Sequence, residues 1–138
     1  MRDELKERCN RIEECYEFML AYAGQGLTGD EGGHTGGQLR HFLNRCNEAL
    51  TGLADLLREI IGAEDLQPFD RYHTFMALVE RDANAAQSVL QLVLCQPSIS
   101  SQLIDNLNAS IHIRTLLTDL FLIDEIIALH GVPKPAAS

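Results

Sequence analysis

Four long segments of this chain carry apolar residues every three or four positions, which is the spacing of one face of an α-helix. The segments cover residues 2–23, 36–61, 68–95 and 99–130. With 138 residues, the chain is long enough for one domain to bury about two thirds of the surface of its unfolded form. The pattern predicts an all-α fold, a four-helix bundle formed as a single domain by residues 1–138.

The connections between these segments contain residues that typically end or begin helices. Residues 24–37 include seven glycines in fourteen positions, which predicts a long, flexible, glycine-rich loop between the first two helices. At its end, Thr35 and Gln38 have the spacing of a capping box for the second helix. We expect Pro68 to be the first residue of the third helix and Ser98 to cap the fourth.

The fourth segment is the most apolar of the four and shows isoleucine, leucine and phenylalanine side chains nearly all around the helix axis. Large apolar patches are rare on soluble monomers, so a second surface is needed to cover this helix. We therefore expect a homodimer in which the fourth helix, together with the third, forms much of the interface. The alternative is a fourth helix that is enclosed by its own chain and bent near Asn108. Residues 132–138 are expected to form a frayed tail.

Acidic side chains outnumber basic ones in this chain by 20 to 11, which gives a formal net charge of −9 at pH 7. Such a charge opposes binding to phosphate backbones and to anionic lipids, so nucleic acid and membrane surfaces are not expected partners. The opening residues, Met1 to Glu4, are not followed by the apolar stretch of a secretory signal. We therefore expect a cytoplasmic protein whose partner is a second copy or another protein.

The four cysteines, Cys9, Cys15, Cys46 and Cys95, include no Cys-x-x-Cys pair, so the usual signatures of zinc ribbons and redox pairs are missing. Cys9 and Cys46 fall within apolar stripes, where a reduced cysteine behaves as a small apolar side chain. Cys15 and Cys95 lie near the edges of such stripes, and partial exposure is expected for both. A disulfide framework is not expected.

A continuous polar stripe follows the last segment. Its members are spaced by four, three, four, three and four residues, namely Ser101, Asp105, Asn108, His112, Thr115 and Asp119. One interpretation gives His112 the role of metal ligand or general base, with neighbouring carboxylates in support. The other is a face in contact with water, as polar stripes on bundle helices usually are. If the last helix lies at a dimer interface, these side chains could instead pair across the dimer axis.

The third segment supplies a further set of possible metal ligands. Asp70 and His73 lie one helical turn apart, and Glu80 follows two turns later. Together with His112 and Asp119 they are the candidate ligands of a metal- or small-ligand-binding bundle. A di-iron carboxylate bundle would need a second Glu-x-x-His pair and further inward carboxylates, and the chain has neither.

Motifs of catalysis and phosphate binding are missing from the chain. The histidine phosphotransfer motif His-x-x-Lys-Gly is not present at His41, where the run continues Phe42-Leu43-Asn44-Arg45. The glycine-rich stretch lacks the phosphate-binding pattern ending in Gly-Lys-Ser/Thr, and no Gly-x-Ser-x-Gly occurs. The sequence therefore favours a non-enzymatic interaction or regulatory module, with no assigned catalytic residue and no cofactor other than a metal ion.

Overall fold

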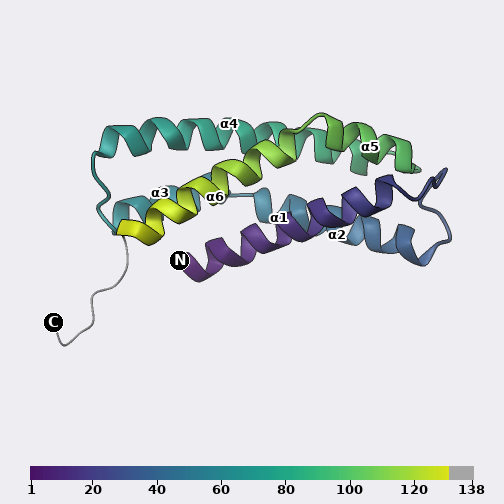
Figure 1. Cartoon of the computed structure of the whole chain (residues 1–138), viewed down its shortest axis with the longest axis horizontal. Coiled ribbons are helices and arrows are strands. Elements are labelled where there is room, and N and C mark those ends of the chain that lie inside the picture. The colour runs from purple at the N-terminus through teal and green to yellow at the C-terminus, as the bar shows by residue number, and fades with distance from the viewer. Residues whose placement is uncertain (131–138) are drawn as a thin grey trace.

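The structure, a computed structural model, describes residues 1–130 apart from the side chain of His34. The tail predicted for residues 132–138 lies outside this range. Within the described residues the fold is all-α, as predicted, and contains no β-strand. These residues form six helices rather than the predicted four, namely α1 (Arg2–Ala23), α2 (His34–Leu50), α3 (Leu53–Ala63), α4 (Phe69–Leu94), α5 (Ser101–Ala109) and α6 (His112–His130). Their arrangement is drawn in Figure 1.

The predicted second helix is divided into α2 and α3, so the prediction of one helix over residues 36–61 is wrong. Thr51 is extended and Gly52 has a φ of 74°, a left-handed conformation that glycine adopts at little cost. The carbonyl groups freed by the break are bound by distant side chains. Arg8 of α1 donates to the carbonyl oxygens of Ala49 (3.1 Å) and Thr51, and Gln87 of α4 donates to the Thr51 hydroxyl oxygen (3.0 Å).

The predicted fourth helix is divided as well, into α5 and α6. The break falls at Ser110 and Ile111, just after the residue where a bend was considered, and Ile111 has a φ of 59°. A left-handed conformation is costly for a β-branched residue, and neither glycine nor proline marks this position. Asn108 donates a hydrogen bond to the Met19 carbonyl oxygen of α1 (3.2 Å), which ties the break to α1.

Three of the predicted helix starts also differ from the structure. α2 begins at His34 with Gly33 as its N-cap and no capping side chain, so the capping box at Thr35 does not form. The cap of α5 is Ser100, whose hydroxyl accepts from the Leu103 amide, rather than Ser98. Pro68 precedes α4 as its N-cap instead of being its first helical residue.

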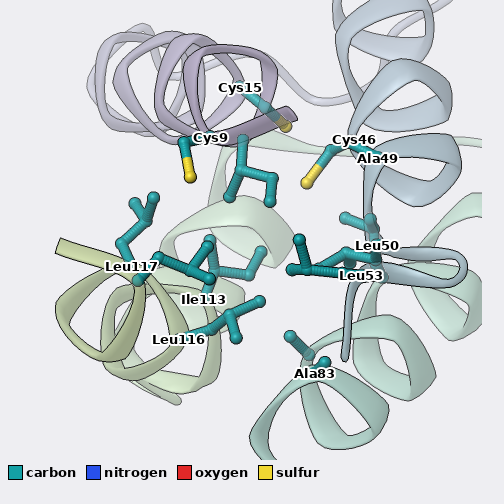
Figure 2. Packing of buried hydrophobic residues seen from close by; sticks show 14 of the residues in the cluster. Cys9, Cys15, Cys46, Ala49, Leu50, Leu53, Ala83, Ile113, Leu116 and Leu117 are labelled. Carbon is teal, nitrogen blue, oxygen red and sulfur yellow. The ribbon is translucent and has the colours of Figure 1, made fainter. Parts of the chain in front are cut away.

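One apolar core connects all six helices. α1 packs against α2, α3, α5 and α6, whereas α4 packs against α2, α3 and α6 and, less extensively, α5. In Figure 1, α4 runs along one edge of the molecule and α1 along the opposite edge. Each helix contributes fully buried side chains to this core, among them Ile12, Leu43, Leu57, Leu90, Ile104 and Leu116. Figure 2 shows part of the core around Cys46, Leu53 and Leu116. No helix within residues 1–130 has the length and apolar character needed to cross a membrane.

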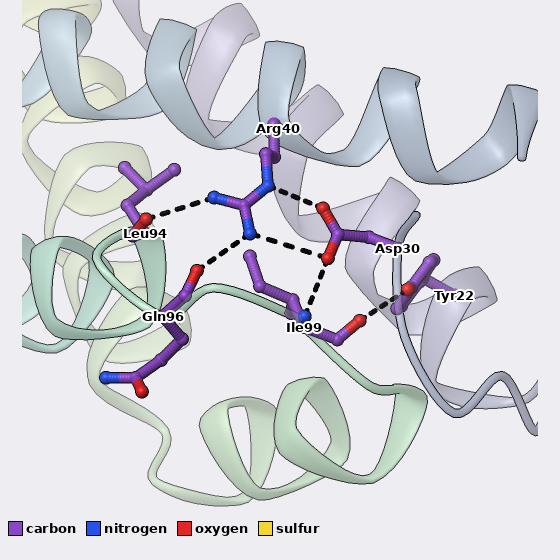
Figure 3. Close-up of polar contacts among 6 residues, drawn as sticks. All are labelled: Tyr22, Asp30, Arg40, Leu94, Gln96 and Ile99. Atoms are coloured by element: carbon purple, nitrogen blue, oxygen red, sulfur yellow. Dashed lines mark hydrogen bonds and ion pairs between the residues drawn. The ribbon is translucent and has the colours of Figure 1, made fainter. Parts of the chain in front are cut away.

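The glycine-rich connection occupies residues 24–33, because α2 starts earlier than predicted. It is fastened to the segment between α4 and α5 through Asp30 (Figure 3). The Asp30 carboxylate accepts hydrogen bonds from Arg40 and from the Ile99 amide (2.7 Å). Arg40 also donates to the carbonyl oxygens of Leu94 (3.1 Å) and Gln96 (2.8 Å), so one guanidinium joins the loop to the end of α4.

Ser101 makes a second attachment nearby. Its hydroxyl donates to the Tyr22 carbonyl oxygen (2.7 Å) and accepts from the Leu27 amide (2.9 Å), while its own amide donates to the Leu27 carbonyl oxygen (2.9 Å). The Tyr22 hydroxyl donates to the Ile99 carbonyl oxygen (2.6 Å; Figure 3). Ser101 is almost fully buried, so these bonds satisfy polar atoms that water cannot reach.

We predict that Asp30→Asn lowers the free energy of unfolding near neutral pH by about 1.5–3 kcal/mol, the range for hydrogen bonds to charged groups. The hydrogen bond from Arg40 is the main reason why the pKa of Asp30 is lowered, and the Ile99 amide adds to this effect. A lowered pKa means that the carboxylate stabilises the fold above its unfolded pKa and loses this contribution as pH falls through the folded one. Chemical denaturation of both proteins at neutral and acidic pH measures the difference.

Asp55→Asn is the matched control, because Asp55 contacts Arg58 only at the surface, with 81% of its side chain exposed. It should change the free energy of unfolding by less than about 0.5 kcal/mol. Equal effects of the two substitutions would show that the Asp30 contacts do not stabilise the fold.

Candidate interaction surface

α4 and α6 lie side by side and leave one joint face without a covering helix. On each of the two helices, the side chains of this face are spaced alternately by four and three residues. None of its side chains is fully buried. We call it the outer face, and its members are Arg71, Phe75, Leu78, Asp82, Ala85, Val89 and Leu92 of α4 with Thr115, Asp119, Leu122, Ile126 and Leu129 of α6.

An apolar groove lies at one end of the outer face, where the start of α4 meets the second half of α6. Its volume is about 310 Å³, which is enough for a few side chains or a small ligand. The only charged group on its wall is the guanidinium of Arg71. The groove is lined by Pro68, Arg71, Tyr72, Phe75, Leu122, Ile123 and Ile126.

Exposed apolar side chains surround this groove and continue beyond it. Leu122 and Leu129 of α6 are 53% and 71% exposed. At the opposite end of the face, Leu92 of α4 is 63% exposed, and Ile111, just before α6, is 55% exposed. α6 is therefore not enclosed by the described part of its own chain, and apolar surface remains uncovered on this side of the molecule.

Two carboxyl groups face each other in the middle of the outer face, Asp82 from α4 and Asp119 from α6. Burial, together with the hydrogen bond and the charge of Asp82, raises the pKa of Asp119 to about 7. One oxygen of Asp119 is buried and has no hydrogen-bond donor among the described residues. A proton on one carboxyl group would supply the missing hydrogen bond, so the pair is suited to hold one proton near neutral pH.

The candidate ligands of the third predicted helix, Asp70, His73 and Glu80, do not come together as one site in the structure. Asp70 and His73 are exposed near the start of α4, and the His73 ring stacks on Phe69 with 6.0 Å between ring centroids. Glu80 is bound by Arg58 of α3, with 2.7 Å between nitrogen and oxygen. These three side chains are thus engaged with water, an aromatic ring and an arginine.

The polar stripe predicted for the last helix is divided by the break between α5 and α6. His112 is exposed at the first position of α6, whereas Ser101 is buried at the start of α5 and Asn108 binds α1. Asp119 meets Asp82, a residue that the sequence analysis did not single out. Within residues 1–130 no three His, Cys, Asp or Glu side chains gather closely enough to hold a metal ion. The metal site therefore stays a prediction without a formed ligand cluster.

Three of the four cysteines belong to the core. Cys9 and Cys46 are buried as predicted, but Cys15 is also fully buried, so the expectation of its partial exposure is wrong. Its thiol is hydrogen-bonded to Cys46, and this bond together with burial raises the pKa of Cys15 (Figure 2). Only Cys95 is exposed, as its position at the edge of an apolar stripe predicted.

Comparison with known proteins adds nothing to this geometry. No protein-family model, no curated protein and no solved structure was found to match the chain. The outer face thus combines a groove, exposed leucines and a carboxyl pair.

We predict that Asp119→Asn stabilises the protein at about pH 8 and has little effect at about pH 4, because the substitution removes a carboxylate that the fold disfavours. A pKa raised from 3.8 to about 7 means that the carboxyl group costs stability progressively as pH rises between these values. The side chain is partly exposed, so solvent screening limits the gain to on the order of 1 kcal/mol. Denaturation curves at several pH values measure it.

Asp124→Asn on the same helix is the control, because Asp124 is exposed and its charge acts on Arg2 of α1. Its stability should not rise with pH relative to the unsubstituted protein. If Asp119→Asn and Asp124→Asn have the same pH profile, the carboxyl pair does not form in solution.

Proposed function

We propose that this protein is a non-enzymatic interaction or regulatory module and that it forms a homodimer through the outer face of α4 and α6. The proposal is supported by the apolar surface that these two helices leave uncovered. A second copy can cover that surface with an identical one, as in most soluble dimers.

The observation that carries this proposal is the uncovered apolar surface of the outer face, which has a groove at one end and the exposed Leu92 at the other. Tyr72, in the wall of the groove, lies ten residues before Asp82, and the exposed Leu92 lies ten residues after it. At 1.5 Å per residue, both are roughly 15 Å from Asp82 along α4. A two-fold rotation about an axis through Asp82 therefore brings Leu92 of each copy opposite the groove of the other.

The two symmetric contacts of Leu92 with the groove would be mainly apolar. Burying one leucine side chain contributes about 1.5–3 kcal/mol, and the symmetry doubles each such contribution. Leu122 at the rim of the groove would be covered by the same contact. Arg71 in the groove wall adds a guanidinium group, which is enriched at protein interfaces.

We predict that Leu92→Asp prevents dimer formation. Loss of two buried leucines and introduction of two charges should raise the dissociation constant by at least about 100-fold. Sedimentation velocity over a range of micromolar concentrations, at about pH 6, measures the dissociation constant.

Leu20→Asp is the matched control, because Leu20 is a leucine of α1 with 50% exposure that lies outside the outer face. This variant should dimerise like the unsubstituted protein. A chain that is monomeric throughout the concentration range, or an equal loss in both variants, would contradict the proposal.

A further inference from the structure

The carboxyl pair at the centre of the outer face suggests how dimer formation could be controlled. This inference rests on the proposed homodimer. We propose that Asp82 and Asp119 make dimerisation dependent on proton uptake. Two copies associate while each pair holds a proton, and they separate when all the carboxyl groups are ionised.

The position of the pair on the proposed two-fold axis leads to this inference. Within one chain, Asp82 and Asp119 already face each other across the contact between α4 and α6. An axis through Asp82 brings the same two side chains of the second copy to the same place. Four carboxyl groups would then meet among apolar side chains, where ionised groups repel each other and lose contact with water.

No basic side chain is directed at the pair from the neighbouring helices. Asn47 of α2 and Arg58 of α3 reach α4 on a different flank, where they bind Gln87 and Glu80. On the outer face itself, Arg71 is eleven residues from Asp82, which is roughly 16 Å along the helix.

The charges brought by the other elements are also directed elsewhere. Asp124 of α6 acts on Arg2 and Cys9 of α1, and Glu13 of α1 likewise acts on Cys9. Asp105 of α5 is exposed beside the glycine-rich connection. Asp82 alone is responsible for the charge effect on Asp119 within the described residues.

Arg81 on α4 and Arg114 on α6 are exposed, and neither contributes to the raised pKa of Asp119. Since no cation neutralises the pair, protons are the simplest means of removing its charge. A shared proton would convert the repulsion within each pair into a carboxyl–carboxylate hydrogen bond, which is short and strong. The equilibrium thereby takes up as many as two protons for each dimer formed.

The test is the dissociation constant of the dimer as a function of pH, measured by sedimentation at constant ionic strength in the presence of EDTA. We expect the constant to rise between about pH 6.5 and 8, by about 10-fold per pH unit for one proton and about 100-fold for two. The double variant Asp82→Asn/Asp119→Asn should dimerise to the same extent at every pH in this range.

His73 and His112 are exposed on the same two helices, so controls are needed. Asp124→Asn should keep the pH dependence of the unsubstituted protein. If the double variant does not fold, the single variants Asp82→Asn and Asp119→Asn replace it in this test, with their helix content checked by circular dichroism. Each single variant should weaken the pH dependence of the dissociation constant.

Several results would overturn the inference. A dissociation constant that is independent of pH, in a dimer that Leu92→Asp still dissociates, would refute proton control and leave the proposed dimer intact. A chain that is monomeric at every pH would refute both. Persistence of the full pH dependence in the double asparagine variant would also contradict proton uptake by this pair.

Discussion

The fold depends on the burial of the apolar stripe of α1, because four of the five other helices pack against this one helix. The stripe is completely or almost completely removed from water and consists of Leu5, Cys9, Ile12, Cys15, Met19 and Tyr22. The breaks between α2 and α3 and between α5 and α6 allow all four of these helices to pack against α1. Each break is in turn held by polar contacts with α1, through Arg8 at the first and through Asn108 and Met19 at the second.

α4 lies on the edge opposite α1, and this position determines where apolar surface remains (Figure 1). One flank of α4 is bound to α2 and α3, for example through Gln87 and Glu80. The other flank meets α6 and, less extensively, α5, so no further helix of the described residues covers the outward side chains of α4 and α6. The outer face follows from this packing, and the pair formed by Asp82 and Asp119 lies in the middle of it, with Arg71 at one end.

The sequence was sufficient to predict the helical segments and most of the core, because apolar spacing reports directly on burial. It did not reveal the breaks, since the first depends on Arg8 and Gln87 from distant helices and the second places Ile111 in a conformation that sequence preferences disfavour. The partnership of Asp82 with Asp119 was not recognisable from the sequence, because it depends on how α4 and α6 align.

The arrangement of two copies about Asp82 is tested most directly by a distance between spin labels attached to Cys95, the exposed cysteine at the end of α4. Cys95 lies thirteen residues beyond Asp82, roughly 20 Å along the helix, so an antiparallel pair of α4 helices separates the two labels by about 40 Å. Double electron–electron resonance at about pH 6, where the carboxyl pair can hold its proton, should show one distance near this value. A distance below about 25 Å, or no dipolar signal at all, would contradict the antiparallel packing of the α4 helices of two copies about Asp82.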